Sequence, residues 1–244
     1  MTRLIPILAA GALVMLASGC NFGNQGEARD AGPVVDRKFA VGAFDRISVS
    51  GPYDVTVKTG DGAAVSARGG QAILDETEVV VENGELHIRP RQRNGMSWNR
   101  GSDGQVKMTV TASAIRGAAV AGSGGLDIDR VAGGDFMASV AGSGDLAVGS
   151  IEANSAEFEI AGSGGVRAGG KVAKVAVSIA GSGDVDLSGL TATDASVSIA
   201  GSGNVRTRAT GTAAISMLGS GDVVVTGGAK CEVSKQGSGD VRCS

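Results

Sequence analysis

The tripeptide Gly-Ser-Gly occurs seven times in the C-terminal half of the chain, at nearly constant spacing. Successive copies are 18 to 20 residues apart, and their first glycines are Gly122, Gly142, Gly162, Gly181, Gly201, Gly219 and Gly237. A constant period of this length marks a repeat architecture, in which each repeat buries its apolar face only against its neighbours. This feature decides the fold class but leaves the chemistry open.

Apolar residues recur at fixed distances from these turns. Two positions before the first glycine stand Val120, Val140, Ile160, Ile179, Ile199 and Met217. Four positions after it stand Leu126, Leu146, Val166, Val185, Val205, Val223 and Val241. This alternation predicts strands with one face inward, and the repeat is too short for a strand plus a packed crossover helix. The sequence therefore predicts an all-β fold, a parallel β-solenoid (β-helix) with about 20 residues per coil.

The residue after each Gly-Ser-Gly turn is often acidic. Aspartate stands there at Asp145, Asp184, Asp222 and Asp240, and Gly165 and Asn204 interrupt the series. Calcium-binding nonapeptide repeats also combine glycine with aspartate, but their period is about half as long. We therefore favour turn chemistry over calcium: glycine supplies positive φ, and short polar side chains bond the local backbone.

The N-terminus has the pattern of a lipoprotein signal. A basic residue precedes an apolar run over residues 4–17, which is shorter than the roughly 20 residues of a membrane-spanning helix. The tetrapeptide Ala17-Ser18-Gly19-Cys20 resembles a lipobox, so we predict a signal peptide over residues 1–19, lipidation of Cys20 and a flexible tether over residues 20–38. Asn21 favours sorting to the outer membrane. Ordinary secretory cleavage, with a free thiol on Cys20, is the alternative.

Residues 39–244 are enough for a single solenoid domain. We expect an irregular N-terminal β part over residues 39–104 and regular repeats over residues 105–244. In the irregular part, Asn83-Gly84 separates two alternating apolar runs, which is a strong signal for a two-residue β-hairpin. This part is expected to cap the first coil, whose sheet edges and core would otherwise be exposed.

Two further cysteines, Cys231 and Cys243, lie six residues before and six residues after Gly237, both in rows that face the core. In an oxidising envelope such a pair favours a disulfide across the interior of the last coil. Two cysteines without a neighbouring histidine are too few for a zinc site.

The opening of the domain and its turns together resemble a known family. The spacing Phe44-x-x-Ile47-x-Val49-x-Gly51-x-x-x-Val55-x-Val57, the hairpin Gly84-x-Leu86 and the later Ala-Gly-Ser-Gly-x-Leu/Val turns are similar to the bacterial family described as putative auto-transporter adhesin, head GIN domain. The resemblance covers about Phe44 to Ser244. It implies a β-solenoid in extracytoplasmic, often lipid-anchored proteins, and it carries over no established catalytic residues.

Charge and residue counts exclude several functions. The net charge of −3 provides no electrostatic field for nucleic acid. The chain has one histidine, His87, which we expect to be an exposed strand residue, so histidine-based catalysis and multi-histidine metal sites are excluded by count. No cofactor is predicted.

Two pairs of carboxylates have the composition of a glycosidase centre, Asp127 with Asp129 and Asp184 with Asp186. In the row five positions after each turn, however, Asp186 falls between Arg167 and Arg206. This arrangement favours surface ion pairs between coils. We therefore predict that the protein is not an enzyme.

Residues 89–104 interrupt the pattern with the only tryptophan, Trp98, among arginines that include Arg91, Arg93 and Arg100. An exposed tryptophan in a basic loop would suit a sugar ring or an acidic partner. The alternative is that Trp98 covers the core where the regular coils begin.

The sequence as a whole predicts a non-catalytic lipoprotein of the bacterial envelope, held outside the cytoplasm at a membrane by the lipid on Cys20. Its solenoid is expected to be an adhesin-like module that binds a glycan or an envelope protein, because stacked sheets offer a rigid, extended face. A structural or stress-related scaffold is the alternative function, and a carbohydrate-active enzyme is a third.

Overall fold

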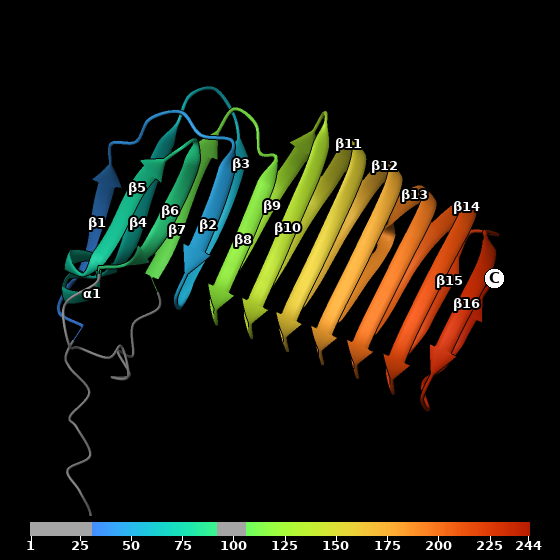
Figure 1. Ribbon diagram of the computed structural model, residues 1–244. Helices are drawn as coiled ribbons and strands as arrows, with labels where there is room; N and C mark the ends of the chain where they lie inside the picture. Colours follow the sequence, from blue (N-terminus) through green and yellow to red (C-terminus); the bar gives the residue numbers. More distant parts are fainter. Residues whose placement is uncertain (1–30, 92–105) are drawn as a thin grey trace, which may run out of the picture.

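The computed structural model describes residues 31–91 and 106–244, and most of these lie in strands of one continuous β-solenoid (Figure 1). Each coil has two walls. We call the strand that leads into the turn the first wall and the strand that follows the turn the second wall. Within each wall of the regular coils, neighbouring strands run parallel, which confirms the predicted parallel β-solenoid.

The regular coils contain strands of two lengths. The shorter ones belong to one wall each: β8 (Gly117–Gly122), β10 (Asp135–Gly142) and β16 (Lys230–Gln236) in the first wall, and β9 (Gly125–Ala132), β15 (Val223–Thr226) and β17 (Val241–Cys243) in the second. The longer ones run through the second wall of one coil into the first wall of the next: β11 (Asp145–Gly162), β12 (Gly165–Gly181), β13 (Asp184–Gly201) and β14 (Asn204–Gly219).

Equivalent residues of successive coils lie opposite one another and form ladders. Ile160 pairs with Ile179, Ile179 with Ile199 and Ile199 with Met217. The apolar rows at fixed distances from the turns are buried, apart from the partly buried Val241, and they make the core. Parallel stacking therefore converts the repeat in the sequence into a continuous apolar interior.

Two further coils precede the regular ones, and their order in space differs from their order in the chain. One contains β2 (Arg46–Ser50) and β3 (Tyr53–Thr59), and the other contains β6 (Glu85–Pro90) and β7 (Val106–Ala112). The β2–β3 coil lies between the β6–β7 coil and the β8–β9 coil, because β2 pairs with β6 and β8, and β3 pairs with β7 and β9.

The β2–β3 coil is a repeat without the Gly-Ser-Gly sequence. Gly51 occupies the position of the first turn glycine with φ of +116°, close to the +115° of Gly122, and its N–H donates to the carbonyl of Ala121. Val49 and Val55 stand at the same distances from Gly51 as the core rows stand from later turns, and both are buried. Those distances are the sequence signal that identifies this coil.

An antiparallel cap covers the N-terminal end of the stack, as predicted. In the second wall, β4 (Ala64–Gly70) pairs with β7, and β1 (Val34–Phe39) pairs with β4; in the first wall, β5 (Thr77–Glu82) pairs with β6. The helix α1 (Gln71–Asp75) joins β4 to β5 and buries Ile73 and Leu74 in the core. Figure 1 shows β1 and α1 at this end of the molecule.

The hairpin of β5 and β6 turns at Asn83-Gly84, as predicted, and both residues have positive φ, as a two-residue turn of type I′ requires. The start of the folded domain differs from the prediction. Because β1 begins at Val34, the domain extends into the predicted tether of residues 20–38. Residues 34–39, two valines followed by three charged residues and a phenylalanine, pair with β4, a partner that local composition does not reveal.

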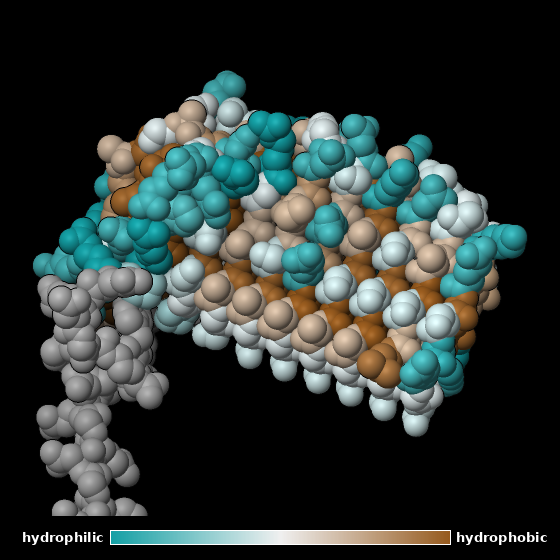
Figure 2. Space-filling model, viewed as in Figure 1, coloured by the Kyte–Doolittle hydropathy of each residue, from teal (hydrophilic) through white to brown (hydrophobic). Residues whose placement is uncertain are grey.

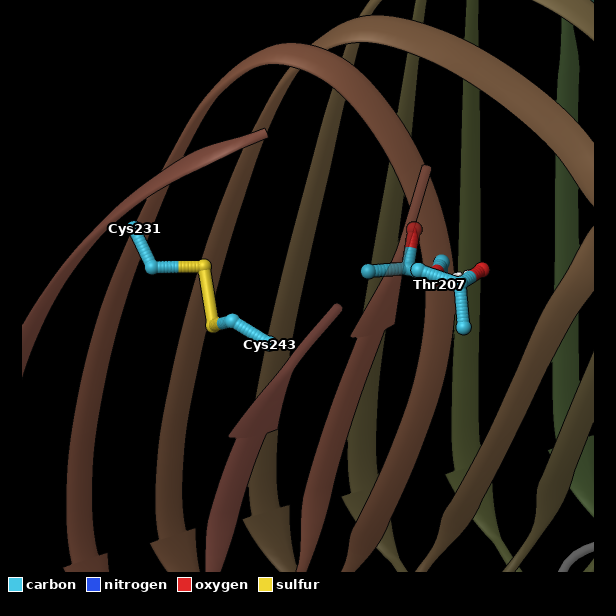
Figure 3. Close-up of a disulfide and its surroundings, with 4 residues drawn as sticks. Thr207, Cys231 and Cys243 are labelled. Atoms are coloured by element: carbon cyan, nitrogen blue, oxygen red, sulfur yellow. Dashed lines mark hydrogen bonds between the residues drawn. A yellow bond between two sulfur atoms is a disulfide. The ribbon is translucent and has the colours of Figure 1, made fainter. Parts of the chain in front are cut away.

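A disulfide joins Cys231 on β16 to Cys243 on β17, with 6.6 Å between their Cα atoms. Figure 3 shows this bridge between strands of the two walls, together with Thr207 of β14. The bridge forms as predicted because Cys231 lies opposite Ala213, and Cys243 opposite Val225, both of which are buried in the core.

Among residues 31–91 and 106–244, no helix has the length and apolar character needed to cross a membrane. The predicted signal peptide and Cys20 lie outside the described residues.

Candidate binding groove

The Gly-Ser-Gly turns bring successive coils into close backbone contact. Gly201 has φ of +142°, and a side chain on Gly201 or Gly203 would overlap a backbone carbonyl of the preceding coil. From Ser143 on, the backbone N–H of each turn serine donates to the carbonyl of the first turn glycine of the coil before it, for example Ser202 to Gly181 at 2.8 Å. The serine hydroxyls point outward instead of making the bond between coils.

The aspartates that follow the turns bond to the backbone of the next coil. Asp145 Oδ1 accepts from the N–H of Gly165 at 3.0 Å, and Asp184 Oδ1 accepts from the N–H and the Nδ2 of Asn204. In the same way, Asn204 Oδ1 accepts from the N–H of Asp222, and Asp222 Oδ1 accepts from the N–H of Asp240. These bonds agree with the turn-chemistry interpretation. In the described part of the chain, no three His, Cys, Asp or Glu side chains form a group suited to a metal ion.

A groove of about 580 Å³ lies on the second wall, over β9 and the strands β11 to β14. We call it the arginine groove. Its charged lining residues are Asp127, Asp145, Arg167, Asp184, Asp186 and Arg206. A shallower hollow of about 360 Å³ adjoins it, shares Arg167 and Asp186, and includes Gly149, Gly169 and Gly189 in its lining. The side-chain-free glycines leave room next to the charged row.

Arg167, Asp186 and Arg206 lie side by side on three successive strands, as the sequence predicts. The predicted ion pairs between them are absent among the described residues. Asp186 instead accepts hydrogen bonds from the N–H of Ser188 at 3.1 Å and from its hydroxyl at 2.7 Å. These bonds, followed by the positive charges of Arg206 and Arg167, hold the pKa of Asp186 below its usual value, although partial burial acts in the opposite direction.

Both arginines of the groove are exposed, and neither guanidinium has a hydrogen bond or an ion pair to any residue that the structure describes. A guanidinium presents five N–H donors in a planar fork that matches carboxylates and other oxygen acceptors. The groove therefore combines two unused donor groups with a carboxylate that stays ionised.

Of the other carboxylates considered for catalysis, Asp129 and Asp184 have structural partners. Asp129 accepts from the N–H and the hydroxyl of Thr59, at 3.0 and 2.7 Å, and so ties β9 to β3. Partial burial acts to raise the pKa of Asp129, but hydrogen bonds from Thr59 and from the backbone of Arg130 outweigh it, and the pKa lies below its usual value.

The single histidine, His87, is partly buried and not exposed as expected. Its Nε2 lies 3.9 Å from Glu82 on the other strand of the hairpin.

Of the predicted basic loop, Trp98, Arg93 and Arg100 lie outside the described residues, and Arg91 is exposed at the end of β6. The N–H of Arg91 donates to the carbonyl of Glu76. Ile88 pairs with Val49, and Val106 pairs with Tyr53. The sequence between Ile88 and Val106 is therefore longer than the sequence between their partners, Val49 and Tyr53.

The outer face of the first wall is lined by small residues. The row directly before the turns contains Ala121, Ala141, Ala161, Ala180 and Ala200, and continues with the exposed Leu218 and Gln236. Figure 2 shows this face, with rows of pale and tan residues along the edge where the strands end. It carries fewer charges near that edge than the arginine groove does.

Solved bacterial structures share this fold. A putative adhesin from Bacteroides fragilis NCTC 9343 superposes with a TM-score of 0.78 at 20% identity, over 87% of this chain and 97% of its own. A putative lipid binding protein from Parabacteroides distasonis ATCC 8503 gives 0.73 at 22% identity with the same coverage of both chains. A putative adhesin from Parabacteroides merdae ATCC 43184 gives 0.70 at 15% identity, over 88% and 98%. At these identities the likeness concerns the fold.

Among curated proteins, none matches the chain in sequence. Residues 43–229, most of the chain, match the family that the turn spacing and the hairpin already resemble. The protein therefore belongs to the family described as putative auto-transporter adhesin, head GIN domain.

Proposed function

We propose that this protein is a non-catalytic, adhesin-like module of the bacterial envelope that binds a glycan in the arginine groove. The observation that carries the proposal is the pair of exposed guanidiniums, Arg167 and Arg206, which have no partner among the described residues although they flank a carboxylate. Sugar hydroxyls and acidic groups are the ligands that such a mixture of donors and acceptors suits.

The rigid scaffold supports a binding role. The groove lies on strands whose backbones are bonded on both sides, so its side chains are held at fixed intervals before a ligand arrives. A preformed site loses less conformational entropy on binding than a flexible one. The membership of an adhesin-like family agrees with this role.

The carboxylates favour binding over hydrolysis. Glycosidases use two carboxyl groups that flank the scissile bond, one of them with a raised pKa. In the groove, Asp145 and Asp184 bond to the backbone of the next coil, and the pKa of Asp186 is lowered instead. Asp186 is therefore poorly suited to donate a proton, and its negative charge suits recognition instead.

A glycan array tests the proposal directly. We expect the full chain to retain one or more glycans and the double variant Arg167→Ala/Arg206→Ala to lose most of this binding. Arg208→Ala is the matched control, because Arg208 is an exposed arginine on β14 outside the groove lining. Equal retention by the double variant and the control would rule out the groove as the binding site.

The proposal includes the location of the protein, which is anchored to a membrane of the bacterial envelope. Lipidation of Cys20 would tether the domain to a membrane, with the outer membrane as the expected destination. Mass spectrometry of the protein from membranes should find a lipid on Cys20, and Cys20→Ser should release the protein from the detergent phase. An unmodified Cys20 in membrane-extracted protein would contradict the anchor.

Residues 89–105 are a second candidate binding segment, because this basic stretch with Trp98 is longer than the three residues between the paired positions of the next coil. Trp98→Ala should weaken glycan binding and leave the melting temperature nearly unchanged if the loop binds. A blue-shifted, quencher-resistant fluorescence of Trp98 would instead favour the capping role.

A further inference from the structure

The arginine groove has a spacing that a ligand must match. Arg167, Asp186 and Arg206 stand at the same position of three successive strands. Neighbouring strands of a sheet lie about 4.8 Å apart, so the two arginine positions are about 9.6 Å apart along the solenoid axis. The groove therefore repeats its positive charge every second coil, with a negative charge halfway between.

The charge at the middle position, Asp186, is always negative at neutral pH. Hydrogen bonds from Ser188 and the two flanking arginines keep Asp186 ionised at neutral pH, and Ser188 holds its Oδ1 in place. A ligand group opposite Asp186 must consequently donate a hydrogen bond or carry no negative charge. A ligand group opposite either arginine must accept hydrogen bonds, and an acidic group would do so most strongly.

Further carboxylates in the groove disfavour dense polyanions. Asp145 and Asp184 also line the groove, as does Asp127, which stands in the same row two coils before Arg167, and all three are exposed. The lining therefore contains more carboxylates than guanidiniums. A polymer with an acidic group on every unit would place like charges against Asp186 and its neighbours, and such contacts cost binding free energy.

On the basis of the proposed function, we infer that the groove selects a linear polysaccharide in which acidic and non-acidic sugars alternate, lying along the solenoid axis. A sugar unit of an extended chain advances by a distance close to the strand spacing, so each coil meets one unit. The acidic groups fall on Arg167 and Arg206, and the hydroxyl or amide N–H of the sugar between them donates to Asp186.

Toward the C-terminal end of the solenoid the row continues with the same period beyond the groove, whereas toward the N-terminal end it reaches Asp127. Val224 lies opposite Arg206, and Arg242 lies opposite Val224, two coils from Arg206. Arg242 has a long ion pair of 3.7 Å with Asp240, and both side chains are well exposed. A longer ligand of the same repeat would meet this third arginine after one uncharged position.

Three soluble polymers separate the alternatives when titrated against the full chain. Hyaluronan oligosaccharides carry one carboxylate per disaccharide, polygalacturonate carries one on every sugar, and cello-oligosaccharides carry none. We expect hyaluronan to bind most tightly. Arg167→Ala and Arg206→Ala should each weaken its binding about tenfold or more, as the loss of a charge-assisted hydrogen bond does, while Arg208→Ala leaves it unchanged.

The variant Asp186→Asn tests directly whether the charge of Asp186 selects the ligand, because asparagine retains the Oδ1 acceptor for Ser188 and removes the charge. The change should improve the binding of polygalacturonate several-fold and leave that of hyaluronan within a factor of about three. Circular dichroism of each variant checks that the exposed substitutions leave the fold intact.

The outcomes distinguish this inference from the proposed function. If cello-oligosaccharides or polygalacturonate bind at least as tightly as hyaluronan and the arginine variants abolish that binding, the glycan groove stands and the alternating ligand is wrong. An unchanged preference in Asp186→Asn overturns the alternation as well. If no polymer binds and the glycan array is blank, both proposals fail.

Discussion

The regular coils over residues 117–243 and the N-terminal part over residues 34–112 form the same two walls, but they are connected differently. In the regular coils each strand pairs with a strand about 20 residues away, and chain order equals spatial order. In the N-terminal part Arg46 pairs with Gly117, and antiparallel strands close the end.

This difference shows which contacts specify each region. In the regular coils, the same turn, the same core rows and the same polar ladder recur, and each residue packs against the equivalent residue of the next coil. The N-terminal part depends on individual contacts. The buried Tyr53 hydroxyl, for example, lies 3.2 Å from Thr77 Oγ1, which donates to the carbonyl of Ile73 in α1. Changes that act on repetition and changes that act on single contacts should therefore have different consequences.

The largest expected effect comes from adding a methyl group to a turn of the regular coils. Gly201→Ala should cost about 4 kcal/mol, because positive φ is unfavourable for alanine and the new Cβ would overlap the carbonyl of Gly181. Gly84→Ala in the N-terminal hairpin should cost only about 1 kcal/mol, since φ is also positive but the nearest atom is 3.9 Å away. Denaturant unfolding measures both, and equal losses would refute the role of close coil contact.

Removing the disulfide should have the next largest effect. Cys231→Ser/Cys243→Ser opens a loop with a sequence separation of 12 residues, which the chain-entropy account values at about 3 kcal/mol. The loss should be local, because a solenoid coil contacts only its neighbours. Hydrogen exchange should accelerate in β16 and β17 and stay unchanged in β1 to β7. Uniform acceleration along the chain would show that the two regions unfold as one unit.

Two buried threonines provide a smaller and opposite pair of effects. Thr207 in the regular coils is 1% exposed, and its hydroxyl has no partner among the described residues. Thr207→Val should stabilise the protein by about 1 kcal/mol, because it removes an unsatisfied buried hydroxyl. Thr77→Val in the cap should destabilise it by about 1 kcal/mol, since Thr77 bonds both Tyr53 and Ile73. Melting temperatures test the pair, and shifts of the same sign would contradict the assignment.

The smallest effect concerns acid at the junction of the two regions, where Asp129 of β9 accepts from Thr59 of β3. Because the folded pKa of Asp129 is lowered, its contribution to stability is present above the unfolded pKa of about 3.9 and is lost as the pH falls through the folded pKa. Asp129→Asn should therefore flatten the acid limb of the stability curve below about pH 4. An acid limb identical to that of the unaltered protein would contradict the contribution of Asp129.

The regular fold could be predicted because its determinants repeat in the sequence. The core rows, the turns and the cysteine pair all follow from positions counted from the Gly-Ser-Gly glycines. The insertion of the β2–β3 coil between two later coils could not be predicted. Its partner strands lie up to 71 positions away, and no local sequence pattern identifies them. Only the spacing of Ile47, Val49 and Val55 around Gly51 indicated a coil there.

The candidate groove was predictable in part. Counting from the turns placed Asp186 between Arg167 and Arg206, and the register confirms that row. The direct ion pairs were wrong, because Ser188 lies two residues further along the same strand and bonds the carboxylate more closely. Such local competition depends on side-chain geometry, and neither residue spacing nor charge reports it.

The position of the β2–β3 coil also has a consequence for how the molecule assembles. A chain synthesised from its N-terminus presents β2 and β3 early, directly after β1, yet their neighbours on both sides come later, up to β9 at residues 125–132. Pairing in the regular coils closes loops of only about 20 residues, whereas the pairing of β2 with β8 closes a loop of about 70 residues. Closing longer loops costs more entropy and slows folding. The first coil to be made should thus be among the last to become native, and the regular stack is the template on which it docks.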